Sequence, residues 1–288
     1  MRTELRTAAD QAADAAARAR VDIRLLGGVD EVREASRLVA DIWGTGSNDA
    51  QLPSDVLRAL VHAGNYAAGA FADGALVGAV VAFLGIDNQA TYLHSHILGV
   101  SAQRRGSNIG FALKQHQRAW ALEHGLRKVT WTFDPLVRRN AYFNLQKLGA
   151  DAAAYHESFY GQMTDGINAG DESDRLLIEW DLDTTRVSEA ASGHQPEPSS
   201  DDLLASGASV ALSEDSRGGP EAHAVSGTTA LCVTPENIVR LRRQDAQTAL
   251  RWRKALRETL GSAMHDGFRV SGFTRSGWYV LSREADHE

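Results

Sequence analysis

The sequence has 288 residues, of which 43% are hydrophobic and 23% are charged, and its formal net charge is −7. This composition is that of an ordinary globular protein and excludes fibrous and wholly disordered classes. The acidic balance argues against nucleic acid as the main partner, because phosphate binding needs a positive surface. No stretch approaches the roughly 20 apolar residues of a membrane span, and the N-terminus has no apolar leader segment. We therefore expect a cytoplasmic protein that does not associate with membranes.

The only cysteine is Cys232, so no intramolecular disulfide can form. A reactive thiol needs a nearby base or positive charge that the sequence does not locate. We expect Cys232 to be a small buried residue of a strand.

The first part of the chain alternates between helical and strand patterns. Residues 1–20 are rich in alanine and predict an additional N-terminal helix, frayed or docked on a partner. Residues 21–26 predict a strand, and apolar residues recur at helical spacing over residues 30–43. A second helix begins at Pro53 and runs to His62.

A hairpin is the strongest local signal. Strands over 66–72 and 76–84 are joined by Asp73-Gly74, a pair typical of tight hairpin turns. A further strand covers 91–100, and a helix covers 109–124 and ends at Gly125. Beyond it we expect a strand over 129–133, a helix over 138–148, and strands over 150–160 and 175–182. Residues 21–185 thus predict one α/β (α+β) domain, a mixed sheet flanked by helices.

The C-terminal part differs in composition. Residues 186–227 are rich in Ser, Gly, Pro, Ala and Asp without any period, which predicts a flexible linker. Residues 228–288 predict a strand, a long helix from Pro235 to about His265, and a hairpin. At roughly 60 residues this β-α-β-β subdomain has a marginal core, so we expect it to pack on the first domain or on a partner subunit.

Strand, polar turn and helix follow one another at residues 94–110, which is the arrangement that holds phosphate groups. A helix N-terminus presents unpaired backbone N–H groups and positive partial charge. Arg104 and Arg105 add positive charge there, and Gly106 and Gly110 allow close approach of a pyrophosphate. A plain capped helix with solvated arginines explains the same spacing, since short glycine loops are only weakly diagnostic.

Several segments together resemble one family. Arg105-Gly106-Ser107-Asn108-Ile109-Gly110 resembles the R-x-x-G-x-G/A cofactor loop of the GNAT (GCN5-related N-acetyltransferase) superfamily, with Asn108 where the first motif glycine is expected. Asn tolerates a left-handed backbone better than most residues. Residues 140–150 are similar to the family's fourth-helix pattern, but Leu145 stands at its tyrosine position.

A little-characterised branch of predicted GNAT acetyltransferases is the nearer resemblance, and it covers residues 21–182. Trp131-Thr132-Phe133-Asp134-Pro135-Leu136 reproduces its W-T-F-D-P-L segment. The other matching segments are Ile42-Trp43-Gly44, Leu93-His94-Ser95-His96, Tyr160-Gly161, Asp174-Arg175-Leu176 and, in the tail, residues 249–253 with Gly267, Phe268 and Gly272.

The resemblance implies a GNAT-like fold with a mostly antiparallel sheet and a C-terminal strand-helix-hairpin extension. It implies direct transfer of an acyl group, most simply from acetyl-CoA, to an amine of a small molecule, with no metal. It also assigns the cofactor contacts to the end of the fourth strand, the loop after it, and the fourth helix. These residues are Leu98, Gly99, Val100, Arg104, Arg105, Gly106, Ser107, Asn108, Ile109, Gly110, Asn140 and Asn144.

Direct transfer needs a base for the amine and an acid for the leaving thiolate. His94 and His96 are two residues apart in one strand, so they share a face, and histidine titrates near neutrality. They are either the base or a pair of hydrogen-bonded structural residues, and a metal site ranks lower because no third ligand accompanies them. For the acid we name Tyr142, with Tyr155 and Tyr160 as alternatives.

We expect Trp43, Trp131, Asp134 and Arg253 to contact the acceptor. Asp134 before Pro135 also fits an ordinary turn. The tail helix has an apolar stripe made by Ala249, Trp252, Leu256, Leu260 and Ala263, which predicts a face turned to the core. Arg253 and Arg257 on its other flank are either a solvated basic face or a grip for an anionic acceptor.

Three functions stay open at this point. The first is the N-acetyltransferase. The second is a non-catalytic acyl-CoA-binding sensor or assembly subunit, which Leu145 and Asn108 favour. The third is a transferase for a longer acyl donor. A homodimer is also open.

Overall fold

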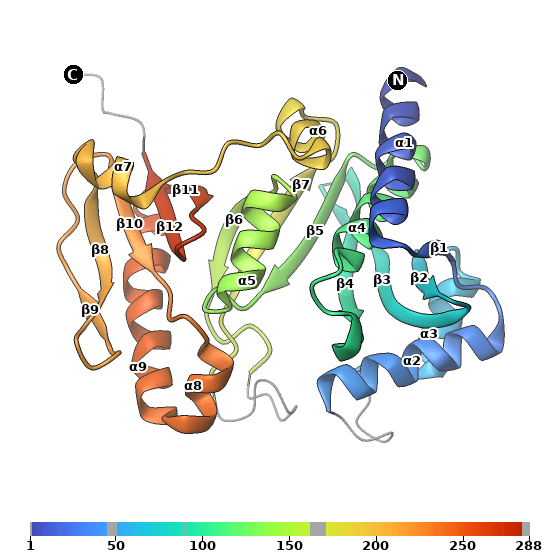
Figure 1. Cartoon of the computed structure of the whole chain (residues 1–288), viewed down its shortest axis with the longest axis horizontal. Helices are drawn as coiled ribbons and strands as arrows, with labels where there is room; N and C mark the ends of the chain where they lie inside the picture. The colour runs from blue at the N-terminus through green and yellow to red at the C-terminus, as the bar shows by residue number, and fades with distance from the viewer. Residues whose placement is uncertain (1, 45–50, 89, 162–170, 284–288) are drawn as a thin grey trace. The chain divides into compact units, whose positions relative to one another are not determined.

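The computed structural model describes residues 2–44, 51–88, 90–161 and 171–283, which divide into two compact units (Figure 1). Unit 1 runs from the N-terminus to Trp131 and includes residues 180–192. Unit 2 begins at Thr132 and includes residues 171–179 and 193–283. The division falls inside the strands β5 (Lys128–Phe133) and β7 (Arg175–Asp181).

Unit 1 contains strands in the order β1-β2-β3-β4-β5, antiparallel as far as β4, with β4 and β5 parallel. This is the mixed, mostly antiparallel sheet that the sequence predicted. Its remaining elements are α1 (Arg2–Ala19), β1 (Asp22–Leu25), α2 (Val29–Trp43), α3 (Ser54–His62), β2 (Ala67–Ala72), β3 (Ala75–Asp87), β4 (Ala90–Val100), η1 (Ala102–Arg104), α4 (Ile109–Glu123) and α6 (Thr185–Ser192).

Helices cover both faces of this sheet because its strands alternate between two apolar surfaces. Ala79 and Val81 of β3 belong to a buried cluster with residues of α2 and α3. Gly78, which precedes Ala79 and so points to the opposite face, faces α4: a Cβ there would lie 3.1 Å from Ile109 Cγ2 and 3.2 Å from Leu113 Cδ1. The sheet of unit 1 therefore has an α2 face and an α4 face.

The hairpin turn between β2 and β3 is confirmed. Asp73 and Gly74 both have positive φ, 51° and 80°. Two consecutive left-handed residues are what a type I′ turn requires, and its twist matches that of the strands it joins.

The N-terminal helix α1 docks within unit 1. Its alanines at positions 8, 12, 15 and 19 are buried and form one stripe, and α1 packs on α4 and α6. The Gln11 side chain donates to the Ser188 carbonyl at 3.1 Å and accepts from Arg118 Nη1 at 2.6 Å. The small side chains allow close helix approach, so the frayed form of this helix, one of our two expectations, is wrong.

Unit 2 contains the pair β6-β7 and a second sheet in the order β11-β12-β10-β8-β9. All pairs in that sheet are antiparallel except β8 with β10. Its elements are α5 (Arg138–Ala141), η2 (Tyr142–Lys147), β6 (Asp151–His156), α7 (Ser200–Ala205), β8 (Ser209–Glu214), β9 (Pro220–Ala222), β10 (Thr229–Val233), α8 (Ile238–Gln244), α9 (Ala246–Leu256), η3 (Arg257–Gly261), α10 (Ser262–His265), β11 (Arg269–Phe273) and β12 (Trp278–Ser282).

The segment 186–227 corrects our expectation of a flexible linker. It contains α6, α7, β8 and β9, and β8 pairs with β10 in the second sheet. Ala211 and Leu212 of β8 are completely buried. The Ser, Gly and Pro content marks the turns between these short elements rather than a continuous coil.

The predicted long helix of the tail is interrupted at Asp245. This residue has φ −150° and ψ 86°, ends α8, and caps α9 by accepting from Thr248 N at 3.0 Å. An Asp that bonds the backbone three residues on competes with a continuing helix. The apolar stripe predicted for this helix is confirmed, since Ala249, Trp252, Leu256, Leu260 and Ala263 are all buried.

Two stretches were expected as plain α-helix, residues 138–148 and residues 235–265. Each contains a π-helical turn, η2 in the first and η3 in the second. In η2 the Leu148 N–H donates to the Phe143 carbonyl, five residues back, at 3.0 Å. Such turns insert one extra residue and often lie at functional sites. Apolar spacing cannot distinguish them from α-helix.

Within unit 2 the C-terminal residues pack against the segment that follows β5. The Tyr279 hydroxyl donates to the Pro135 carbonyl at 2.7 Å, and Arg138 Nε donates to Thr234 Oγ1 at 3.3 Å. Elements β11 and η3 both contact β6. The tail therefore shares a core with residues 132–156.

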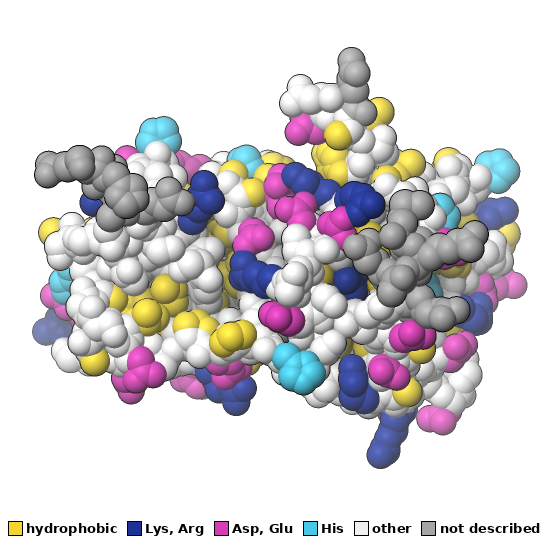
Figure 2. All heavy atoms as spheres, turned by 90° about the horizontal axis from the view of Figure 1, so that it is seen from above, with side chains coloured by type: hydrophobic (Ala, Val, Ile, Leu, Met, Phe, Trp, Pro, Cys, Tyr) yellow, Lys and Arg dark blue, Asp and Glu magenta, His cyan; other side chains and the backbone are white. Residues whose placement is uncertain are grey.

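On the face drawn in Figure 2, Lys and Arg side chains are interspersed with Asp and Glu side chains. In the part of the chain that the structure describes, no helix combines the length and apolar character of a membrane span.

Because Leu212 is fully buried in β8 and Leu204 in α7 is 39% exposed, the two leucines test the order of the 186–227 segment. We expect Leu212→Ala to lower the free energy of unfolding by about 2–5 kcal/mol, the usual cost of truncating a core leucine. The matched Leu204→Ala change should stay within about 0.5 kcal/mol. Denaturant unfolding measures both, and equal small losses would show that β8 is not part of the core.

Candidate active site

Strand β4 carries the two predicted histidines and contains a β-bulge. Ala82 of β3 pairs with Ser95, while the preceding residue Val81 pairs with Ile97, so His96 is an extra residue on β4. The bulge reverses the alternation of β4. Ser95 bonds to α4, whereas Ile97 belongs to the cluster on the α2 face.

The bulge keeps the two histidines together on one side of β4. Their ring centroids are 6.4 Å apart, and both rings lie against Phe83, at 5.1 Å for His94 and 5.8 Å for His96. His94 Nδ1 is hydrogen-bonded to Thr130 Oγ1 of β5 at 3.0 Å. His96 is the more exposed of the two.

The pKa of each histidine is shifted downward. Burial, then the neighbouring His96, then the charge of Lys114 lower the pKa of His94 to about 4. Crowding by protein atoms also lowers the pKa of His96, although this residue keeps more solvent contact. Both rings are therefore neutral at pH 7, and a neutral imidazole can accept a proton.

The end of β4 is set by a close contact with α2. A Cβ on Gly99 would lie 2.7 Å from Ile42 Cδ1 and 3.0 Å from Trp43 Cζ3, so a side chain here would displace Ile42 and crowd Trp43. Glycine thus lets the C-terminal turn of α2 approach the strand closely. The predicted residues Trp43 and Gly99 are thus brought together.

The loop from Ser101 to Asn108 ends in a left-handed residue before α4. Gly106 has φ 85° and Asn108 has φ 60°, and Asn108 is the N-cap of α4 without a capping bond from its side chain. Asn108 therefore supplies the conformation for which the motif uses glycine. The first turn of α4 contains no acidic residue.

The two loop arginines differ. Arg104 Nη2 lies 3.5 Å from the Asp73 carboxylate, an exposed ion pair. Arg105 is exposed and makes no ion pair among the described residues. Ser107 Oγ donates to the Arg104 carbonyl at 2.5 Å and fixes the turn. Of the two positive charges, that of Arg105 is the one available to an anion.

In unit 2, the fourth-helix residues occupy α5 and η2. Leu145 and Asn144 are buried, and Asn140 is partly buried. The Tyr142 hydroxyl donates to Glu197 and accepts from Arg275 Nη2 at 3.3 Å. The proposed acid is thus already engaged with a carboxylate and a guanidinium of its own unit.

The alternative tyrosines have different surroundings. Tyr155 donates to Asp174 Oδ2 at 2.7 Å; burial, and then this carboxylate, hold the pKa of Tyr155 far above its ordinary value. Tyr160 is 45% exposed, lies 3.3 Å from Thr132 Oγ1, and has the Arg175 guanidinium over its ring. Tyr155 is held as a hydrogen-bond donor within unit 2.

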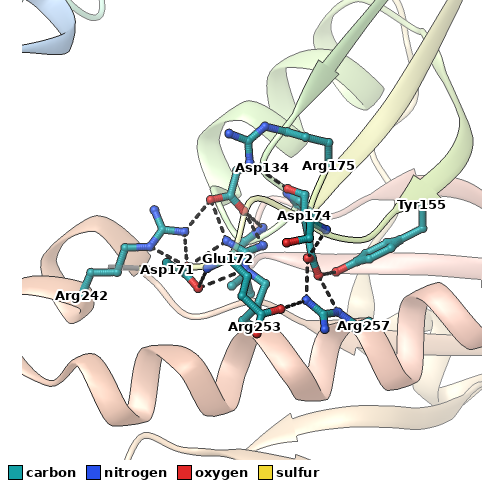
Figure 3. A network of polar contacts seen from close by, with 12 residues as sticks. Asp134, Tyr155, Asp171, Glu172, Asp174, Arg175, Arg242, Arg253 and Arg257 are labelled. Atoms are coloured by element: carbon teal, nitrogen blue, oxygen red, sulfur yellow. Dashed lines mark hydrogen bonds and ion pairs between the residues drawn. The ribbon is translucent and has the colours of Figure 1, made fainter. Parts of the chain in front are cut away.

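Asp134 and Arg253 form the centre of a buried ionic cluster (Figure 3). Arg253 makes two bonds to Asp134, at 2.8 Å and 3.0 Å, and a third to Asp171 at 2.9 Å. Arg242 also bonds both carboxylates. The four side chains have exposures of 0% for Arg253, 5% for Asp171, 6% for Asp134 and 7% for Arg242.

Mutual pairing keeps Asp134 and Arg253 charged. Burial alone would raise the pKa of Asp134, but the charges of Arg253 and Arg242 outweigh it and hold this pKa well below its usual range. Arg257 extends the cluster to Asp174, at 2.9 Å, and to Glu172 (Figure 3). A solvated basic face for Arg253 was therefore a wrong expectation.

This geometry favours a structural role for Asp134 and Arg253, and their contact with an acceptor stays a prediction. Asp134 Oδ1 also accepts from Leu136 N at 3.0 Å, which makes the turn expected of an Asp before Pro. Trp131, in unit 1, stacks on the buried Lys114 ammonium at 3.7 Å. Among the described residues no group of three or more His, Cys, Asp or Glu side chains could hold a metal.

Sequence reasoning missed Lys114, Asp171 and Arg242 as part of these networks. The contact of Lys114 with Ser95 and those of Arg242 with Asp171 and Asp134 join positions 19, 71 and 108 residues apart in the chain. No spacing within one segment signals such a pair. Cys232 is buried as expected, and burial raises the pKa of its thiol to about 12.

Comparison with known proteins identifies the domain. The model of the acetyltransferase (GNAT) family matches residues 32–149, from α2 to the end of η2. Residues 32–149 form a GNAT acetyltransferase domain. The match includes β4, the loop before α4 and the W-T-F-D-P-L segment, and the GNAT domain thus contains both histidines.

Solved structures with a similar fold include GNAT proteins from several organisms. A GNAT acetyltransferase from Streptococcus pneumoniae is 15% identical with a TM-score of 0.44, over 55% of this chain and 98% of that one. Naa50 from Arabidopsis thaliana, in complex with a bisubstrate analogue, is 18% identical with a TM-score of 0.42, over 56% and 97%. An N-acetyltransferase from Staphylococcus aureus Mu50 is 15% identical with a TM-score of 0.43, over 56% and 97%. No curated protein matches the sequence.

The ionic cluster predicts a large stability loss when one cation is removed. Arg253→Met leaves Asp134 and Asp171 buried with only Arg242 to pair them. We expect the free energy of unfolding to fall by about 3–5 kcal/mol, as for other broken buried pairs. The control Arg243→Met, an exposed arginine of α8, should change it by less than about 0.5 kcal/mol. Calorimetric or denaturant unfolding of both variants decides, and a neutral Arg253→Met would contradict the assigned role.

Proposed function

We propose that this protein is an acyl-CoA-dependent N-acyltransferase that moves an acetyl group from acetyl-CoA to an amine of a small molecule. The observation that carries the proposal is the turn before α4, where Gly106 and Asn108 adopt left-handed backbone conformations inside the GNAT match. This turn leaves the first N–H groups of α4 facing out of the helix. A diphosphate is the natural ligand of such a helix end.

The residues present fit the phosphate portion of acyl-CoA. The first turn of α4 has no carboxylate to compete with an anion, and Arg105 offers an exposed guanidinium that makes no ion pair with the residues the structure describes. Gly106 and Gly110 leave room for close backbone approach. Ser107, Ile109 and the rest of this loop would then contribute backbone N–H groups rather than side chains.

Acyl transfer needs donors directed at the thioester carbonyl, whose oxygen gains negative charge as the amine attacks. In the proposal the donor is a backbone N–H of Leu98, Gly99 or Val100. These residues lie at the end of β4, where Trp43 of α2 packs against the strand. Gly99 leaves no side chain between Trp43 and the strand. The C–N bond then forms as the C–S bond breaks, and the thiolate leaves with a proton.

The amine must lose a proton before or during attack, because an ammonium is no nucleophile. His96 is the better placed base of the pair, since it is the more exposed ring at the bulge of β4. His94 lies beside it, neutral and held by Thr130. We assign proton removal to His96 and orientation to His94.

For the leaving thiolate, Tyr142 is the proposed acid, and its hydroxyl is bonded to Glu197 and Arg275. A guanidinium beside a phenol favours proton release, whereas the carboxylate opposes it. Tyr155 is the weaker alternative because its raised pKa makes it a reluctant donor.

A second function is favoured by one observation. Leu145, at the tyrosine position of the family pattern, is completely buried, and Tyr142 is occupied by its own neighbours. A protein with this arrangement could bind acyl-CoA as a sensor without turnover. Thiol release in a screen of amines and amino acids separates the two functions, because a sensor releases no CoA with any acceptor.

If acetyl-CoA binds over the turn before α4, the charge of Arg105 should contribute to its affinity. Reversing the charge in Arg105→Glu places a carboxylate at the positive end of α4, where it competes with the pyrophosphate. We expect the affinity for acetyl-CoA, measured by calorimetry, to fall by roughly tenfold or more. The same reversal at the exposed Arg18 of α1 should leave the affinity unchanged. Equal affinities in all three proteins would remove the phosphate site from this loop.

Turnover should depend on His96. Replacing it by Gln is expected to lower kcat by roughly 10²-fold or more near pH 7, with acyl-CoA affinity nearly unchanged. A base works when unprotonated, so the parent rate should be full above the pKa of His96 and fall as the pH drops through it. That pKa lies below its ordinary value, which puts the fall on the acidic side of pH 6.5.

The His96→Gln variant should lose this acidic limb. His94→Gln is the matched comparison and should cost less in kcat, because His94 only orients its neighbour. If both variants bind acetyl-CoA and turn over at the parent rate, the pair is structural and another group or water is the base.

A further inference from the structure

Lys114 of α4 is a buried lysine that the acyl-transfer proposal does not use. Its side chain lies on the α4 face of the sheet in unit 1, and the residue is 3% exposed. No described carboxylate pairs with it. Burial lowers the pKa of Lys114 well below its ordinary value. A buried ammonium without a carboxylate partner is costly unless other groups accept its N–H bonds.

The neighbours of Lys114 suit an ammonium. Nζ donates to Ser95 Oγ at 2.9 Å and to Gln117 Oε1 at 3.0 Å. It also lies 3.7 Å from the centroid of the Trp131 ring, with Trp180 at 6.0 Å. An ammonium has three N–H donors, and two oxygens and an aromatic face accept them. These contacts offset part of the cost of burying the ammonium, the cost that lowers the pKa of Lys114.

Two of the residues that contact Lys114, Ser95 and Trp131, lie next to the histidine pair or its partner. Ser95 lies between His94 and His96 and is the last residue before the bulge. Trp131 follows Thr130, whose hydroxyl bonds to His94. Through Ser95, Lys114 contacts the residue that lies between the two histidines of β4. Through Trp131, it contacts the residue that follows Thr130, the hydrogen-bond partner of His94 on β5.

The charge of Lys114 also acts on His94. Within the described part of unit 1, the titratable groups whose charges lower the pKa of His94 are His96 on its own strand and Lys114 of α4, behind the strand. The side chains that contact it from β3 and β5, Phe83 and Thr130, are neutral. In a buried setting a nearby positive charge opposes a second one.

We propose that Lys114 is a positioning residue of the acyl-transfer site: through Ser95 and Trp131 it fixes the bulged His94–His96 segment, and it places a positive charge behind His94. This inference rests on the proposed function. A neutral His94 leaves His96 free to accept the proton of the amine, because a charged His94 would repel the charge that His96 gains. The residue acts from behind the strand and does not touch the substrate.

The test is an NMR titration of the His94 ring in Lys114→Met and Lys114→Arg, with the signal assigned by its loss in His94→Gln. Methionine keeps the length and apolar body of the side chain and removes the charge. We expect the midpoint of His94 to rise by about one pH unit or more in Lys114→Met and to stay near the parent value in Lys114→Arg. The exposed Lys254→Met change in α9 is the matched control and should not move it.

Turnover gives a second readout. Lys114→Met should lose kcat more at pH 5 than at pH 8, with acetyl-CoA affinity unchanged, and Lys114→Arg should restore the loss. A folded Lys114→Met whose His94 titrates as in the parent protein would overturn the proposal, because Lys114 would then be structural only.

The parent protein provides a measurement that does not depend on any variant folding. The ¹⁵N chemical shift of Lys114 Nζ at pH 7 reports its protonation, and an ammonium supports the proposal while a neutral amine overturns it. Failure of the acyl-transfer proposal has a different signature. It would appear as no CoA release with any acceptor, and the His94 titration would still shift in Lys114→Met.

Discussion

The β-bulge of β4 is the constraint on which the geometry of unit 1 depends. His96 has no pairing partner on β3. After it, the alternation of β4 side chains between the α2 face and the α4 face is therefore reversed. Ser95 is thereby turned toward α4 and Ile97 toward α2, while Gly99 meets Trp43. Bulges bend strands and re-aim side chains next to active sites. The two histidines, the tight contact with α2 and the lysine bond all follow from this one extra residue.

Sequence reasoning reached the elements of unit 1 and the turn before α4 because these signals are local. The Asp73-Gly74 turn and the helical spacing after Ile109 each lie within a few residues. The bulge was not visible, since it exists only as a register between two strands. Nor was the pairing of Asp134 with Arg253, 119 residues away, although both had been named as site residues. The segment 186–227 was misread because its short strands depend on pairing with β10.

Unit 2 solves the problem of buried charge by pairing it. Two carboxylates and two guanidinium groups share their bonds, so each desolvation cost is offset by more than one partner. Such a cluster adds little net stability compared with apolar residues of equal volume, but it penalises any arrangement that leaves one member alone. Asp171, between β6 and β7, is thereby held against α8 and α9. The cluster specifies where that segment lies more than it strengthens the fold.

Unit 1 treats buried charge in the opposite way, and the difference has chemical consequences. In unit 2, contact with two guanidinium groups neutralises the charge of Asp134, so the electric field of this carboxylate is small beyond the cluster. The Lys114 ammonium is stabilised by hydroxyl, amide and aromatic groups that carry no net charge, so its field is not cancelled. A field that persists through the strand acts on the nearest titratable ring, which is how Lys114 contributes to the low pKa of His94. Replacing the polar partners by a carboxylate would stabilise the lysine better, yet it would also remove that field. The absence of a carboxylate among the described neighbours of Lys114 is therefore the feature that couples α4 to the histidine pair.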